Sequence, residues 1–135
     1  MNKIEKQVYG HGVAWEESFG YSQGLRCGDT LYISGQLAHD MEGKFIGIGD
    51  FTAQMRAAFE NIDKVLAHFG ASKNQIVNTT VLILNPVENF TLAAAAHREY
   101  FGDHRPASTT LGVVGLAFVE QLVEIAVTVR MDMQA

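Results

Sequence analysis

The sequence predicts one α+β domain, residues 1–135, in which two helices pack on one face of a mixed six-stranded sheet. Two observations indicate this class. First, the spacing of apolar residues changes along the chain from every second residue, typical of strands, to every third or fourth residue, typical of helices, and then back. Second, a strand hairpin is expected at each end of the chain, with both helices between the two hairpins. No linker, repeat or low-complexity tract divides the 135 residues, a length that suits a single core.

The first predicted elements form a hairpin. Residues 30–39 alternate between apolar and polar side chains, which indicates a half-buried strand with Gln36 on its polar side. A shorter strand at 22–26 comes before it, and Gly28 stands where the connecting turn is expected. A weak further strand at 3–9 would bring the sheet to six strands.

The segment 50–69 is predicted to be the first helix. Its apolar side chains recur at steps of three and four, which places them on one face. Asp50 suits the N-cap position because its carboxylate can accept the free amide hydrogens of the first turn. Gly70 can take the left-handed conformation that ends a helix.

The second half of the chain repeats this change of period. Residues 75–84 are rich in β-branched side chains and are predicted to form an interior strand. Asn85 is expected to cap the second helix and Pro86 to occupy its first position. Two strands near 109–114 and 122–131 are then expected to pair as the second hairpin.

The sheet face away from the helices predicts a homo-oligomer. It carries Ser34, Thr80 and Ala126 together with Leu and Tyr side chains, a set too apolar for a face that meets only water. Another subunit is therefore expected to cover part of it.

Charge and composition restrict the class of function. The formal net charge is -5 and no run of Lys or Arg occurs, so a nucleic-acid partner is not expected. The single Cys27 favours a reducing compartment. Residues 1–20 lack the apolar block of a signal peptide, and no membrane span is expected, so the predicted location is cytoplasmic.

A metal site is not predicted from the residue pattern. None of the five histidines stands at a ligand spacing from another His or Cys, and nucleophile-elbow and phosphate-loop motifs are absent. Glu124 has two interpretations. It is either a surface carboxylate on an edge strand or, because Leu122 and Ala126 beside it are apolar, a partly desolvated acid or base.

Short motifs stand in order along almost the whole chain. They are Tyr21-Ser22-Gln23-Gly24, Leu31-Tyr32-Ile33-Ser34-Gly35-Gln36, Gln54 with Phe59-Glu60-Asn61, Thr79-Thr80-Val81, Arg105-Pro106-Ala107 and Leu122-Val123-Glu124-Ile125. In this order and spacing, from about residue 4 to residue 131, the chain resembles the reactive-intermediate deaminase (Rid/YjgF) superfamily, also called L-PSP endoribonucleases. The resemblance implies a chorismate-mutase-like α+β fold, a homotrimer with clefts between subunits, and hydrolysis of 2-imino acids to 2-keto acids and ammonia without a cofactor.

The resemblance also implies roles for particular residues. Glu124 would hold and polarise the attacking water, and Tyr21 would close the wall of the cleft. Gly35 would bring backbone amides near the ligand. Ser34 is a further match to the family pattern.

Two positions depart from that pattern. In the imine-deaminating members an arginine follows the Pro-Ala pair and grips the substrate carboxylate, but here the position holds Ser108. The helix asparagine of those members corresponds to Ala94. Arg105 stands three positions before Ser108, in the loop expected to lead into the strand, from which it could reach back into the cleft. Ser108 and Thr110 offer neutral donors, which suit a carbonyl oxygen better than a carboxylate.

The leading interpretation is therefore a Rid-family protein whose intersubunit cleft binds a small imine, enamine or carbonyl compound and hydrolyses it with water activated at Glu124. Its 2-imino acid deaminase activity is expected to be weak or absent because of Ser108. The alternative is a non-catalytic trimer that binds a metabolite or a partner protein. An endoribonuclease is disfavoured by the acidic charge balance and by the lack of a suitable histidine pair.

Overall fold

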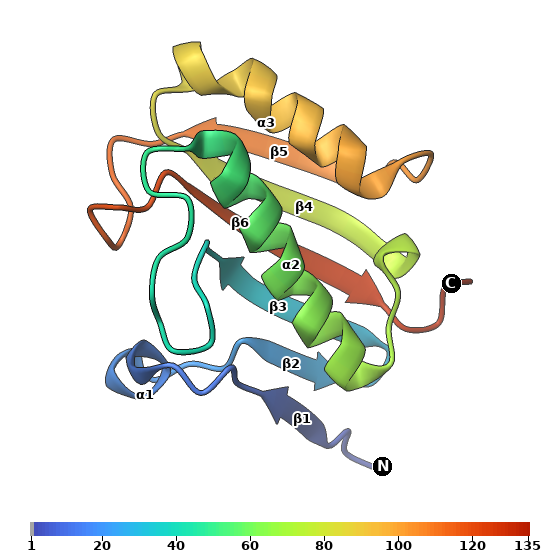
Figure 1. Cartoon of the computed structure of the whole chain (residues 1–135). Helices are drawn as coiled ribbons and strands as arrows, with labels where there is room; N and C mark the ends of the chain where they lie inside the picture. Colours follow the sequence, from blue (N-terminus) through green and yellow to red (C-terminus); the bar gives the residue numbers. More distant parts are fainter. Residues whose placement is uncertain (1) are drawn as a thin grey trace.

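A six-stranded sheet forms one layer of the molecule, with its strands in the order β1-β2-β3-β6-β4-β5 (Figure 1). The computed structural model describes residues 2–135. The strands are β1 (Lys6–Tyr9), β2 (Gly24–Cys27), β3 (Thr30–Gln36), β4 (Ile76–Ile83), β5 (Ala107–Gly112) and β6 (Val123–Arg130). The helices are α1 (Ala14–Phe19), α2 (Phe51–Phe69) and α3 (Pro86–Phe101), with a 3-10 turn at Lys73–Gln75.

Helices α2 and α3 lie side by side on the same face of the sheet (Figure 1). Neighbouring strands run antiparallel except β4 and β5, which run parallel. The expected mixed sheet with both long helices on one face is therefore confirmed. The core lies between this face and the helices, where alternate residues of β6 such as Val123, Ile125 and Val127 are buried.

The N-terminal hairpin is confirmed. Strands β2 and β3 pair antiparallel around a turn in which Gly28 has φ +60°, a conformation that glycine adopts without strain. The weak strand expected at 3–9 exists as β1, which pairs with β2 at the edge of the sheet. Helix α1 was not predicted. It has only six residues, no side-chain cap and no buried residue, so its acidic first turn (Glu16, Glu17) and terminal Gly20 are not accompanied by an apolar face that would reveal it.

The expected C-terminal hairpin is wrong. Strand β5 pairs in parallel with β4, and β6 enters the sheet between β3 and β4. The unit β4-α3-β5 is a crossover, which delivers β5 to the sheet edge in the same direction as β4. The connection 113–122 then carries the chain back past β4, so two strands that are consecutive in sequence are not neighbours.

A bulge in β3 changes which side chains reach the core. Ser34 and Gly35 together lie opposite a single residue of β6, Ala126, because the pairing register shifts by one between Ile33 and Gln36. The shift turns Gln36 inward, where it is 1% exposed. The prediction that Gln36 lies on the polar side of the strand is therefore wrong, since the alternation it relied on ends at the bulge.

The ends of the two long helices differ in their capping. The Asp50 carboxylate accepts a hydrogen bond from the Ala53 amide at 3.0 Å, and Gly70 has φ +69°, so both ends of α2 are confirmed. Asn85 precedes α3 and Pro86 holds its first position, as expected. The Asn85 side chain forms no capping bond, however, and the residue instead takes a left-handed conformation with φ +49°.

Candidate functional site

Glu124 lies on the face of β6 opposite the core. It is half-buried, and Gln121 Nε2 donates a hydrogen bond to its Oε1 at 3.1 Å. Gln121 is fully buried and also donates to the Val123 carbonyl at 3.3 Å, which fixes the amide. One carboxylate oxygen of Glu124 is therefore held by the protein, and the other is directed elsewhere.

That second oxygen lies against Gly35. A β-carbon built on Gly35 would collide with Glu124 Oε2, and the φ of this glycine is not in the left-handed region. The position of the Glu124 side chain therefore depends on the absence of a β-carbon at Gly35. Ser34, beside it, donates its hydroxyl to the Ser22 carbonyl at 2.7 Å. The structure brings Gly35 and Glu124 together and gives Ser34 a role in tying β3 to the segment before β2.

Tyr21 completes this part of the site. Its hydroxyl oxygen accepts from Gln23 Nε2 at 3.1 Å. Burial raises the pKa of Tyr21, and the nearby carboxylates of Glu16 and Glu124 raise it further, so the phenol stays protonated at neutral pH. Since its oxygen already accepts a hydrogen bond, the remaining hydrogen can donate toward the site.

A buried polar network stands behind Tyr21. Gln36 Nε2 donates to Gln23 Oε1 at 2.7 Å, and Gln23 Nε2 also donates to Glu16 Oε2 at 2.9 Å. His11 Nε2 lies 2.8 Å from Gln36 Oε1. The two glutamines are each 1% exposed, so the network fixes the orientation of the Tyr21 hydroxyl. Sequence reasoning did not assign these residues, although polar side chains within predicted strands were a usable signal.

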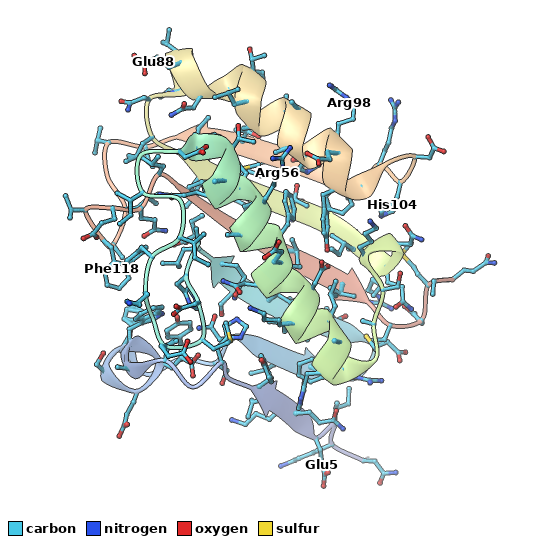
Figure 2. All side chains as sticks on the ribbon, in the orientation of Figure 1. Glu5, Arg56, Glu88, Arg98, His104 and Phe118 are labelled. Atoms are coloured by element: carbon cyan, nitrogen blue, oxygen red, sulfur yellow. The ribbon has the colours of Figure 1, made fainter. Side chains whose placement is uncertain are left out.

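Helix α1 and the connections 37–50 and 113–122 gather at one end of the sheet (Figure 1). Trp15 of α1 packs edge-on against His39 with ring centroids 4.9 Å apart, and against Phe118 at 5.2 Å; Figure 2 labels Phe118 at this end. Two buried polar atoms here, the donor Trp15 Nε1 and the acceptor Gln121 Oε1, make no hydrogen bond of good geometry among residues 2–135, although Trp15 is close enough to Tyr21 to oppose the rise in the pKa of the phenol. Buried polar atoms ordinarily have a partner, so water or a polar ligand is expected near them.

Ser108 and Thr110 lie on the other face of the sheet. In the parallel pairing of β4 and β5, Ser108 is the partner of Thr79 and Thr110 is the partner of Val81, which is buried under the helices. The two hydroxyl residues and α3 line a groove of about 230 Å³. Within one chain, therefore, this pair and Glu124 occupy opposite faces and do not form one site.

Arg105 lies in the loop before β5, as predicted. It lines a neighbouring groove at the C-terminal end of α3, together with His104, and is not among the residues that line the groove of Ser108. Arg98 lines both grooves and was missed by sequence reasoning. Its position one helical turn after Ala94 was the available signal.

Two histidines that are distant in sequence lie close in the structure. The rings of His11 and His39 are 5.7 Å apart. Burial lowers the pKa of both rings, and His39 is only 1% exposed. They are therefore neutral at pH 7, and His39 is shielded from a large substrate. Residues 2–135 contain no group of three or more His, Cys, Asp or Glu side chains placed to hold a metal ion. In the same residues no helix is both long and apolar enough to cross a membrane.

Comparisons with known proteins agree with this architecture. The family model described as Endoribonuclease L-PSP matches residues 13–131. A RutC family protein of Pyrococcus abyssi is 34% identical over 93 residues, which are 69% of this chain and 72% of that protein. A 2-iminobutanoate/2-iminopropanoate deaminase of Dermatophagoides farinae is 29% identical over 96 residues, 71% of this chain and 74% of that protein.

Among solved structures, YyfA of Yersinia pestis, a Rid family protein of unknown function, superimposes with a TM-score of 0.81 at 30% identity. The match covers 93% of this chain and 99% of that one. The chain therefore belongs to the Endoribonuclease L-PSP family, that is, to the Rid/YjgF superfamily.

Proposed function

We propose that the protein hydrolyses a small imine, enamine or related carbonyl compound, with Glu124 activating the attacking water. The observation that carries the proposal is the arrangement of the Glu124 carboxylate. Its Oε1 is held by buried Gln121, its Oε2 lies in the space left by Gly35, and Tyr21 is close enough that the Glu124 carboxylate raises the pKa of the phenol.

In the proposed reaction, the water oxygen bonds to the imine carbon while Glu124 Oε2 accepts one proton. Glu124 returns this proton to the nitrogen, and the resulting carbinolamine collapses to a carbonyl. Its hydroxyl proton passes through Glu124 to the nitrogen, which leaves as ammonia. Tyr21 donates a hydrogen bond to the water or to the leaving nitrogen. A positioned base of this kind typically contributes about 10²- to 10⁴-fold to a rate.

The proposed site is completed by a second copy of the chain. Glu124 and Gly35 lie on the outer face of the sheet, whereas Ser108 and Thr110 line the groove under α3. A homotrimer with clefts between subunits would allow the outer face of one subunit to meet the groove of the next.

The relative from Dermatophagoides farinae is named a 2-iminobutanoate/2-iminopropanoate deaminase. We propose that this chain performs that reaction weakly or not at all, because Ser108 supplies a neutral hydroxyl where the deaminating members have an arginine. Losing a bidentate contact to the carboxylate is expected to cost about 2–4 kcal/mol, roughly 30- to 1000-fold in rate. Installing the arginine by Ser108→Arg should raise the rate of imine disappearance in a semicarbazide competition assay.

The central test is Glu124→Gln, because glutamine keeps the shape of the side chain and removes the base. We expect turnover of imine or enamine substrates to fall to background while light scattering shows an unchanged assembly. Glu120→Gln, a nearby substitution of the same kind before β6, is the matched control and should retain activity. Full activity of a folded Glu124→Gln protein would remove Glu124 from the mechanism.

The alternative function is a non-catalytic trimer that binds a metabolite or a partner protein. It is favoured by Ser108 and Ala94, which stand where the deaminating members have an arginine and an asparagine. With these neutral residues the groove can still bind a ligand, but its strand has no cation to hold a substrate carboxylate. Binding that is retained in Glu124→Gln, with no turnover of any imine or enamine by the wild type, would select this function. Ribonuclease activity is disfavoured, because His11 and His39, whose rings lie 5.7 Å apart, have lowered pKa values and His39 is buried.

A further inference from the structure

The short helix α1 packs against Tyr21 at several points. The ring centroids of Phe19 and Tyr21 lie 5.8 Å apart, and the Tyr21 amide donates to the Glu16 carbonyl at 3.1 Å. The Glu16 carboxylate in turn accepts from Gln23 Nε2 at 2.9 Å. Trp15 and Phe19 are four residues apart and so lie on the same side of the helix. The side of α1 that meets Tyr21 through Phe19 therefore also carries Trp15.

The amide of Gln23 has one possible orientation. Its Nε2 lies 2.9 Å from Glu16 Oε2, and an ionised carboxylate only accepts. Its Oε1 accepts from Gln36 Nε2 at 2.7 Å, and the oxygen of Gln36 lies 2.8 Å from His11 Nε2. Reversing the Gln23 amide would set two acceptors together at Glu16 and two donors together at Gln36. Gln23 Nε2 is therefore a fixed donor, and the Tyr21 oxygen accepts from it at 3.1 Å.

The indole N–H of Trp15 is a second donor close to the same oxygen. It is buried and makes no hydrogen bond of good geometry among residues 2–135. Burial raises the pKa of Tyr21, and the N–H groups of Gln23 and Trp15 oppose that rise, so both donors are near the phenol oxygen. Water could satisfy the indole, but the second lone pair of the Tyr21 oxygen is the acceptor that the protein itself brings to it.

We propose that Trp15 is a positioning residue whose Nε1–H donates to the Tyr21 oxygen beside Gln23 Nε2, so that Tyr21 acts only as a donor toward the ligand of the Glu124 site. A phenol oxygen has two lone pairs, and with both occupied its single hydrogen is all that it can offer. Two donors on one oxygen also polarise the O–H bond and strengthen the hydrogen bond that it donates. The inference rests on the proposed function in taking the Glu124 site as the place of reaction.

A donor-only Tyr21 selects the form of the nitrogen that it contacts. An imine nitrogen or a carbonyl oxygen has a lone pair and can accept from the phenol. The nitrogen of the carbinolamine loses its lone pair when it gains its last proton, and Tyr21 then has no acceptor site with which to retain it. Without the indole N–H, the phenol could rotate and accept from this nitrogen. Trp15 is therefore expected to affect turnover more than substrate binding.

The first test uses nuclear magnetic resonance and needs no substrate. Trp15 is the only tryptophan, so the chain gives one indole N–H signal in a proton–nitrogen correlation spectrum. In Tyr21→Phe, which keeps the ring and removes the acceptor, we expect the indole proton to move upfield and to exchange faster with solvent. Tyr32→Phe makes the same change at an exposed position of β3 and should leave the signal unchanged. An indole signal that ignores Tyr21→Phe would show that the N–H bonds to water, and would overturn the inference.

The second test is kinetic and uses Trp15→Phe, which removes the N–H and keeps an aromatic ring against His39 and Phe118. For an imine or enamine that the wild type hydrolyses, kcat should fall about three- to tenfold with KM changed less than about twofold. Adding Trp15→Phe to Tyr21→Phe should cause no further loss, because the two residues act through one hydroxyl. Equal losses in both backgrounds would mean that Trp15 only packs, and would contradict the inference.

The two tests separate this inference from the proposed function. If the indole signal responds to Tyr21→Phe while the wild type hydrolyses no imine or enamine, the hydrogen bond stands and the proposed hydrolysis fails. If hydrolysis depends on Glu124 while the indole signal does not respond, the proposed function stands and the role of Trp15 is wrong.

Discussion

At the scale of single residues, the position of the Glu124 carboxylate depends on an atom that Gly35 does not have. The carboxylate occupies the space next to the bulge in β3, and Gln121 holds its other oxygen at 3.1 Å. Gln121 is three residues from Glu124 in sequence, whereas Gly35 belongs to a distant strand. The functional group is therefore positioned by the meeting of two strands, and small changes at Gly35 should act on Glu124.

Gly35→Ala should displace the carboxylate, because the new methyl group would occupy the position of Glu124 Oε2. We expect a loss of about 1–3 kcal/mol in the free energy of unfolding, as is usual when a packed site receives an extra carbon. Turnover of any substrate found should fall more than ligand affinity. Chemical denaturation and kinetics of the same preparation measure the two effects. Gly115→Ala is the matched control, since a β-carbon there meets nothing within 4 Å; equal losses in both variants would contradict the explanation.

At the scale of elements, the two long helices begin in different ways. Asp50 accepts a hydrogen bond from the first turn of α2, whereas Asn85 contributes a left-handed backbone conformation before α3. The same type of position thus depends on a side chain in one helix and on the backbone in the other. Stability should therefore depend on the side chain at position 50 and on the freedom of the backbone to adopt positive φ at position 85.

Asp50→Ala should lower the free energy of unfolding by about 1 kcal/mol, because it removes a side-chain cap. Asn85→Gly should be neutral or stabilising, since glycine adopts φ +49° without strain and no side-chain bond is lost. Urea unfolding followed by circular dichroism gives both values. A larger loss for Asn85→Gly than for Asp50→Ala would show that the Asn85 side chain has a role outside capping.

At the scale of the whole molecule, three histidines that are buried or half-buried connect stability to pH. Burial lowers the pKa of His11, His39 and His97 below the ordinary value of 6.5. Above pH 6.5 both the folded and the unfolded chain hold these rings neutral, so their effect is absent. As the pH falls below 6.5 the unfolded chain binds protons first, and the folded state loses stability.

The melting temperature is therefore expected to fall as the pH is lowered from 7.5 to about 5. Differential scanning calorimetry across this range measures the change. His97→Gln, which removes one of these rings, should reduce the slope. A melting temperature that rises as the pH falls would contradict the burial of these rings.

The outer face of the sheet, opposite helices α2 and α3, is the surface through which we expect subunits to assemble. Tyr32 is 53% exposed and Leu111 is 49% exposed on this face of a single chain. We expect a homotrimer that covers them, and Leu111→Lys should produce monomers in multi-angle light scattering. Val87→Lys, at a fully exposed position of α3, is the control and should remain assembled. A wild-type monomer at micromolar concentration would contradict the proposed cleft between subunits.

The sequence alone determined the elements that local interactions control. The period of two in β6 and the period of three to four in α2 follow from which side chains must be buried, and the cap at Asp50 and the turn at Gly28 follow from backbone chemistry within a few residues. The motifs containing Tyr21, Gly35 and Glu124 likewise identified the family. All of these signals lie within short windows of sequence.

Only the tertiary structure decided the pairing of distant segments. It inserted β6 between β3 and β4 in place of the expected hairpin, and it turned Gln36 inward at a bulge that alternation does not reveal. It also placed Ser108 and Glu124 on opposite faces of the sheet and brought Arg98 and Ser108 to the same groove. The physical reason is that strand order and register are set by the packing of all elements together, and a shift of one residue moves a side chain to the other face.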